Sequence, residues 1–151
     1  MAVGITASPD VSVLVDVARD LVGIALRSIG PEPVSPAQFR LLLLLSEDGP
    51  MASAAAARAV GVAPSTVTRV TGRLAAAGLL QRGSDPSHRG GVSLSLTREG
   101  ADLVERVLRR RYVELGDVFD RIDSSDRAST LAGLDALRAA LPTDRSIGGL
   151  W

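Results

Sequence analysis

Residues 52–97 read ASAAAARAVGVAPSTVTRVTGRLAAAGLLQRGSDPSHRGGVSLSLT, which is two helical patterns followed by two strand patterns. Ser53 is the predicted N-cap of the first helix, and Gly61 is placed to end it. Pro64 suits the first position of the second helix, because an N–H at that position has no partner within a helix. The second helix is predicted to run to Gly78.

This second helix has two faces of different chemistry. The face turned to the protein is predicted to carry apolar residues at helical spacing, namely Val67, Val70, Leu74 and Ala77. The outward face carries short hydroxyls and arginines, namely Ser65, Thr66, Thr68, Arg69 and Arg73. Hydroxyls both donate and accept hydrogen bonds, and guanidinium groups bind base edges and phosphates. The outward face therefore suits the major groove of DNA.

Two strands are expected after this helix. The first covers 79–82, and in the second the apolar residues Val92, Leu94 and Leu96 alternate with serines. A polar loop separates the two strands. Helix, turn, helix and hairpin together predict a winged helix-turn-helix within a mainly α (α+β) fold.

Charge is segregated along the chain. The sequence holds 17 basic residues, all of them arginine, and 17 acidic residues. Residues 50–98 contain six arginines and one acid, a net charge of +5, so the remainder carries −5. Such a separation is typical of a polyanion-binding face on an acidic body.

Composition argues against several other classes of protein. Cysteine is absent and His88 is the single histidine, so disulfides, thiol chemistry and a histidine-based zinc site are not expected. We see no nucleophile–base pairing and no phosphate-binding glycine loop, so neither an enzyme nor a cofactor is predicted. Neither a secretory signal nor a membrane span is visible, which favours a soluble cytoplasmic protein.

Four further helices are expected outside the central stretch. They cover about 9–29, 36–46, 98–122 and 126–141. The spacing of Ser35 and Gln38 predicts a capping box, and Thr97 is the expected N-cap of the long helix. Residues 109–111, three consecutive arginines, are expected on its solvated side.

The first helix and the last two are too apolar for solvent, which predicts a homodimer. The chain then divides into an N-terminal dimerisation helix (1–34), a winged helix-turn-helix DNA-binding domain (35–97), C-terminal dimerisation helices (98–142) and a flexible tail (143–151). A two-fold dimer is expected to bind a roughly palindromic operator.

These features resemble the multiple-antibiotic-resistance regulator (MarR) family of bacterial transcription factors over about residues 9–141. The stretches that carry the resemblance are SPAQFRLLLLL (35–45), GVAPSTVTRVTGRLAAAGLLQR (61–82) and DPSHRGGVSLSLTREG (85–100). The resemblance implies a winged-helix homodimer that binds double-stranded DNA and usually represses genes. It also implies that a small phenolic or lipophilic effector releases the DNA.

The resemblance assigns six residues to DNA. These are Ser65, Thr66, Thr68, Arg69 and Arg73 in the groove and Arg89 at the wing tip. The wing departs from the family, because His88-Arg89-Gly90 stands where Asp-x-Arg is usual, and residue 63 is alanine where a polar cap is common. The alternative is therefore a degenerate MarR-like dimer that binds a ligand or a protein without specific DNA binding. The charge segregation argues against that alternative.

Overall fold

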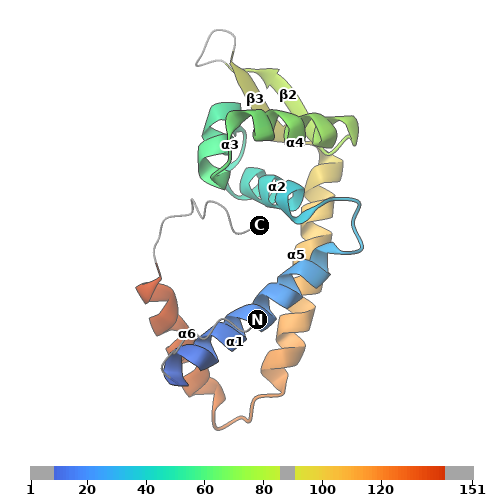
Figure 1. Ribbon diagram of the computed structural model, residues 1–151. Coiled ribbons are helices and arrows are strands. Elements are labelled where there is room, and N and C mark those ends of the chain that lie inside the picture. The colour runs from blue at the N-terminus through green and yellow to red at the C-terminus, as the bar shows by residue number, and fades with distance from the viewer. Residues whose placement is uncertain (1–8, 86–90, 142–151) are drawn as a thin grey trace, which may run out of the picture.

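The structure is a computed structural model that describes residues 9–85 and 91–141 (Figure 1). In chain order its elements are α1 (Pro9–Ile29), α2 (Pro36–Asp48), β1 (Met51–Ala52), α3 (Ser53–Val60), α4 (Pro64–Ala76), β2 (Leu80–Ser84), β3 (Val92–Leu96), α5 (Arg98–Asp120) and α6 (Arg127–Ala140). The predicted mainly α, winged helix-turn-helix fold is confirmed. The expected loose N-terminus, the wing tip with His88 and Arg89, and the tail 143–151 lie outside the described residues.

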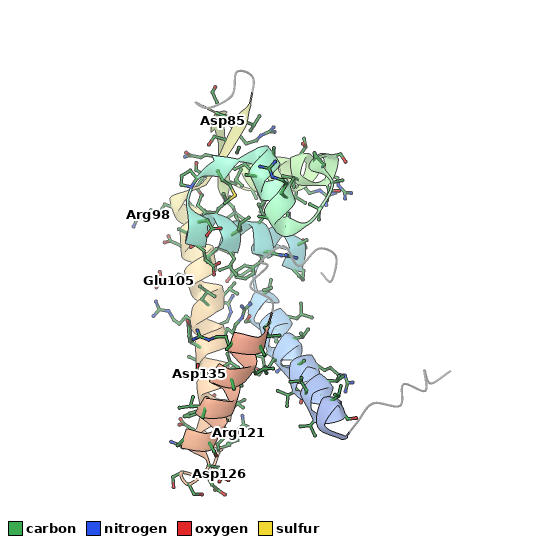
Figure 2. All side chains as sticks on the ribbon, turned by 90° about the vertical axis from the view of Figure 1, so that its left-hand side faces the viewer. Asp85, Arg98, Glu105, Arg121, Asp126 and Asp135 are labelled. Atoms are coloured by element: carbon green, nitrogen blue, oxygen red, sulfur yellow. The ribbon has the colours of Figure 1, made fainter. Side chains whose placement is uncertain are left out.

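The long helix α5 connects the two ends of the molecule. Helices α2, α3 and α4 and the sheet gather around its beginning, whereas α1 and α6 lie towards its far end (Figure 1). Figure 2 shows the same separation, with Asp85 at the base of the wing and Asp126 before α6 at opposite ends.

The sheet is antiparallel, with the strand order β1-β3-β2. In the predicted hairpin, Leu80 pairs with Leu96 and Arg82 pairs with Leu94. The two-residue strand β1 was not predicted. Its residue Ala52 pairs with Ser93 and is held extended.

This pairing corrects the predicted start of α3. Ala52 is the N-cap, without a side-chain hydrogen bond, and Ser53 is the first helical residue rather than the cap. Because β3 fixes the backbone of Ala52, the helix starts where the pairing ends.

The other local signals for helix ends are confirmed. The N–H of Gln38 donates to Ser35 Oγ at 3.3 Å, and the N–H of Ser35 donates to Gln38 Oε1 at 2.7 Å. Gly61 ends α3 in the left-handed conformation, with φ +67°. Thr97 caps α5 by accepting a hydrogen bond from the N–H of Gly100 at 3.0 Å.

The core lies where α2, α4, the sheet and the first half of α5 meet. Its most buried side chains include Leu41, Leu42, Leu74, Leu94, Leu103 and Val107. The prediction for α4 needs one correction, because Ala77 is exposed and Thr71 is buried instead. Helix α4 ends at Ala76, and the hydroxyl of Thr71 donates to the carbonyl of Thr68 at 3.1 Å, which satisfies it inside the core.

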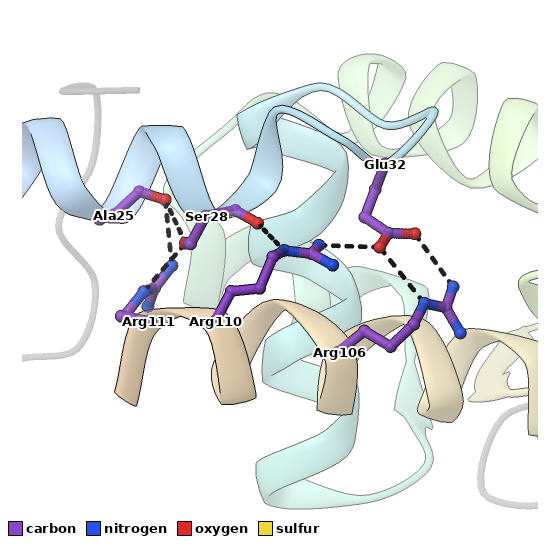
Figure 3. Close-up of polar contacts among 6 residues, drawn as sticks. All are labelled: Ala25, Ser28, Glu32, Arg106, Arg110 and Arg111. Carbon is purple, nitrogen blue, oxygen red and sulfur yellow. Dashed lines mark hydrogen bonds and ion pairs between the residues drawn. The ribbon is translucent and has the colours of Figure 1, made fainter. Parts of the chain in front are cut away.

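The expectation that Arg110 and Arg111 are solvated is wrong. Both side chains join α5 to the end of α1 (Figure 3). Arg110 donates to the carbonyl of Ser28 at 2.9 Å, and Arg111 donates to Ser28 Oγ at 3.3 Å. Only Arg109 keeps the predicted position, exposed and paired with Glu105 one turn away.

Candidate nucleic-acid interface

The outward face of α4 carries the predicted groove-facing residues. Ser65, Thr68, Arg69 and Arg73 are exposed on one side of the helix, opposite buried Val67 and Leu74. Thr66 is half-buried at the edge of this face, beside Val67 and Val70. The structure therefore brings the four exposed residues together and places Thr66 next to them. Their contact with DNA stays a prediction.

The beginning of α4 is suited to binding a phosphate. Pro64 occupies the first turn and Ala63 is the N-cap, with no side-chain hydrogen bond to the first-turn N–H groups. A helix N-terminus carries partial positive charge and N–H donors that an anion can accept from. Because alanine replaces a polar cap here, the cap side chain does not occupy these donors, and a DNA phosphate could take them.

Exposed arginines on this half of the molecule have no partner within the described residues. Five of their side chains form neither a hydrogen bond nor an ion pair there, namely those of Arg58, Arg69, Arg73, Arg82 and Arg98. By contrast, the arginine side chains of α1 and those at positions 106–138 all bond to an acid, a hydroxyl or a carbonyl. Unpaired guanidinium groups are free to neutralise phosphates and release counterions.

Three of these arginines were not assigned to DNA from the sequence. Arg58 lies in the last turn of α3, Arg82 on β2 and Arg98 at the start of α5. The signal for them was present, because each belongs to the stretch 50–98 that has a single acid. The pattern of charge identified the region, but only the fold shows which arginines lack partners.

The base of the wing is ordered by the hairpin. The N–H of Asp85 donates to the carbonyl of Gly91 at 2.9 Å, directly beyond the pairing of Ser84 with Val92. Arg89, the predicted wing-tip residue, lies between these positions and outside the described residues. Its assignment to DNA stays a prediction.

Gly72 in α4 is not required by packing within the chain. A Cβ added there would meet no atom within 4 Å. Glycine costs about 1 kcal/mol relative to alanine inside a helix. Space around Gly72 is therefore open on the side where a partner could approach the backbone.

A separate cavity lies between α1, α2, α3 and α5 and has a volume of about 520 Å³. We call it the interhelical cavity. Its apolar lining includes Leu26, Ile29, Phe39, Leu43, Leu44 and Val60, and its charged lining consists of Arg40, Glu47 and Arg111. A pocket of this size with a few polar groups suits a small organic ligand. The resemblance implies an effector site between the dimerising and DNA-binding parts, but the sequence did not identify these lining residues, because the leucine run of α2 indicates core or interface before a ligand pocket.

The charged groups of this cavity differ in how they are held. The guanidinium of Arg111 lies 5.7 Å from the centre of the Phe39 ring, and burial lowers its pKa from the usual value. Arg40 has no hydrogen-bond or ion-pair partner within the described residues and is half-buried. Arg40 is thus the cation that an incoming anion could bind without displacing another contact.

Two other kinds of site were sought in residues 9–85 and 91–141. No group of three His, Cys, Asp or Glu side chains there is arranged to hold a metal ion. None of the helices in these ranges is both long and apolar enough to cross a membrane.

Comparisons with known proteins agree with this architecture. The sequence pattern of the MarR family matches residues 34–89. The HTH-type transcriptional regulator Mb0904 of Mycobacterium bovis is 31% identical over 107 residues, which span 71% of this chain and 75% of that protein. The crystal structure of RV1404 from Mycobacterium tuberculosis is 31% identical, with a TM-score of 0.80, and the match covers 92% of this chain and 98% of that one.

A more distant structure has the same fold and was solved with a ligand. NadR in complex with 4-hydroxyphenylacetate is 22% identical, with a TM-score of 0.62 over 94% of this chain and 100% of that one. The family pattern covers α2, α3, α4 and β2, and the match to RV1404 extends over nearly the whole chain. The chain belongs to the MarR family and is a winged-helix transcriptional regulator.

Proposed function

We propose that this regulator is a cytoplasmic homodimer that represses genes by binding a palindromic DNA operator and releases it when a small effector binds. One observation carries the DNA-binding part of the proposal. The hydroxyl-rich outward face of α4 lies on the half of the molecule whose five exposed arginines have no partner within the described residues. Such groups are available to base edges and phosphates together.

The exposed apolar surface of the first and last helices supports a dimer. Helix α6 has no buried residue, and the first half of α1 is exposed although it is rich in valine and leucine. Residues 1–34 and 98–142 would form the dimer, and residues 35–97 would form the two DNA-binding heads. A two-fold axis between the α4 helices would match a palindrome with half-sites about one helical turn apart.

The interhelical cavity supports the response to an effector. It lies between α1 and α5, which would form the dimer, and α2 and α3, which carry the DNA-binding head. Its apolar lining with a free cation fits a small phenolic or lipophilic acid, the chemistry of the ligand in NadR. Occupancy of this cavity is expected to alter how the two heads are spaced and so to release DNA.

The direct test of DNA binding is a titration of the chain against its own upstream DNA, followed by fluorescence anisotropy. Arg69→Ala should weaken specific binding by about 1–3 kcal/mol if Arg69 reads a base edge. Arg19→Ala is the matched control, because Arg19 is an exposed arginine on α1 that pairs with Asp16.

The result discriminates between the proposal and a dimer that does not read DNA. The control should bind like wild type provided that light scattering gives it the wild-type mass, since Arg19 lies on a predicted dimerisation helix, and random DNA should bind more weakly than the upstream sequence. Equal binding of wild type and Arg69→Ala would show that α4 does not read the operator. No binding at all would favour the degenerate MarR-like dimer.

A further inference from the structure

A second, smaller space lies beside the interhelical cavity and against α4, which we call the recognition helix because it carries the predicted groove-facing residues. A crevice of about 40 Å³ lies between α2, α3 and α4, and its walls include Val62, Thr66 and Val70. Two side chains, Arg40 and Val60, line both the cavity and the crevice. These two side chains therefore lie between the predicted effector site, which is the interhelical cavity, and the crevice beneath the recognition helix.

The helical period of α2 explains why Arg40 belongs to both spaces. Residues 36, 40, 43, 44 and 47 share the face of α2 that lines the cavity, whereas Ala37 and Leu41 line the crevice. Arg40 adjoins both sets, because Pro36 and Leu44 lie one turn away along the cavity face and Ala37 lies one turn away along the crevice. Its long aliphatic stem can line one of these spaces while the guanidinium group lies in the other.

The two guanidinium groups of the cavity are not equivalent. Arg111 is fixed by hydrogen bonds to Ser28 Oγ and to the carbonyl of Ala25, and by its position over Phe39. Arg40 makes no such bond to the described part of the chain. An anionic ligand would therefore reorient Arg40 at little cost, whereas moving Arg111 would break three contacts.

We propose that Arg40 transmits effector binding from the interhelical cavity to the recognition helix α4. The acidic group of the effector pairs with the guanidinium and draws the side chain towards the cavity. Its stem then withdraws from the crevice, so Thr66 and Val70 lose packing and α4 changes its position. This inference rests on the proposed function, and it makes Arg40 a positioning residue that does not itself contact DNA.

One consequence concerns the chemistry of the effector. A ligand without a negative charge can fill the apolar cavity but does not draw Arg40, so it should bind without releasing DNA. 4-Hydroxyphenylacetate and the neutral 4-methylphenol share a phenolic ring and differ in the carboxylate. Comparing the two ligands therefore distinguishes binding in the cavity from transmission of that binding to α4.

The test measures the coupling between effector and DNA as the ratio of two dissociation constants of the ligand, one for operator-bound protein and one for free protein. We call this ratio the coupling factor. Calorimetry gives the Kd of each ligand for the free protein and for the protein bound to its operator. Coupling between sites typically changes affinity by about 5–150-fold, and it acts equally in both directions. For wild type we expect a coupling factor within this range for 4-hydroxyphenylacetate and a coupling factor near one for 4-methylphenol.

Two variants identify the residue responsible. Arg40→Met keeps an aliphatic stem but has no charge, and its coupling factor should fall to near one even where 4-hydroxyphenylacetate saturates the cavity. Binding of 4-methylphenol by this variant shows that its cavity is intact. Leu43→Ala changes a residue that lines the cavity but not the crevice, so it should weaken ligand binding while keeping the wild-type factor.

The outcomes are distinct. A wild-type factor in Arg40→Met, or equal coupling by the acid and the neutral ligand, overturns the role of Arg40. If the wild-type chain fails to bind its operator, or binds neither ligand, the proposed function itself is wrong and this inference falls with it. Coupling that is lost in Arg40→Met and kept in Leu43→Ala supports the role of Arg40. A merely structural change would weaken ligand or DNA binding as well as the coupling factor.

Discussion

At the scale of single residues, Glu32 holds the turn after α1 against α5. Its side chain is 9% exposed, and its carboxylate pairs with Arg110 at 2.8 Å and with Arg106 at 3.0 Å (Figure 3). The hydrogen bond from Arg106 lowers the pKa of Glu32 below its usual value near 4.5, although burial acts in the opposite direction. A carboxyl whose pKa is lower in the folded state stabilises the fold above its unfolded pKa. That contribution is lost as the pH falls through the folded pKa.

We therefore expect Glu32→Gln to lower the free energy of unfolding near neutral pH by about 1–2 kcal/mol, since charged hydrogen bonds are lost and the arginines stay partly solvated. The difference from wild type should shrink as the pH falls below about 4.5, the usual carboxyl value, because wild type then loses the same charge. Urea denaturation across this range measures it. Glu105→Gln, at an exposed pair within α5, should change stability by less than about 0.5 kcal/mol at any pH. A constant difference across the range would contradict this role of the charge.

Residues that act locally could be predicted, whereas those that act across the fold could not. The face of α4 with Arg69 and Arg73 follows from helical periodicity alone. The environments of Arg110 and Arg111 do not, because Glu32 and Ser28 lie 78 and 83 residues away in the sequence. Arg40 is a similar case, since the sequence does not show that two spaces meet beside it.

At the scale of elements, the first turn of α5 is fixed to the turn between α4 and β2. Thr97 Oγ1 accepts a hydrogen bond from the N–H of Gly100 and donates one to the carbonyl of Gly78 at 2.7 Å. Gly100 itself lies against the backbone of Leu79, and a Cβ there would come within 2.0 Å of the Leu79 carbonyl oxygen. These contacts set the direction in which α5 leaves the DNA-binding head.

Thr97→Val should lower the free energy of unfolding by about 1–3 kcal/mol, because it removes the cap and leaves the carbonyl of Gly78 without its hydroxyl partner. Thr97→Ser keeps the hydroxyl and should retain most of the stability. Thermal unfolding of the two variants beside wild type measures the difference. A loss in Thr97→Ser with none in Thr97→Val would show that the methyl group matters rather than the hydrogen bonds.

Element ends were predictable where the signal is local and unpredictable where a distant strand sets them. Ser35, Gly61 and Thr97 act within one helical turn, and the structure confirms all three. The start of α3 depends on Ala52 pairing with Ser93, more than 40 residues along the chain. A two-residue strand has no periodicity, so neither β1 nor the cap that it determines could be inferred.

At the scale of the whole molecule, the two ends differ in how completely they are packed. The DNA-binding end buries its leucines around α2, whereas α1 and α6 leave large apolar side chains in solvent. The most exposed on these two helices include Val13 (64%), Leu131 (51%), Val15 (50%) and Leu134 (47%). An isolated helix as short as α6 is marginal in water, so its stability requires packing against another surface. The sequence predicted this excess of apolar surface, and the single chain does not cover it.

A second copy of the chain is expected to cover these helices and to bury an obligate-size interface of about 2,000 Å² or more. Light scattering should then give about twice the 15.7 kDa of one chain. Leu134→Asp should shift the protein towards monomer, because it places a charge inside the apolar contact, and Ala132→Asp, on the opposite side of α6, is the matched control. The monomer should also lose most of its affinity for a palindromic site, since one head then binds one half-site. A wild-type chain that stays at 15.7 kDa at micromolar concentration, or a Leu134→Asp variant that keeps the wild-type mass, would rule out α6 as part of the interface.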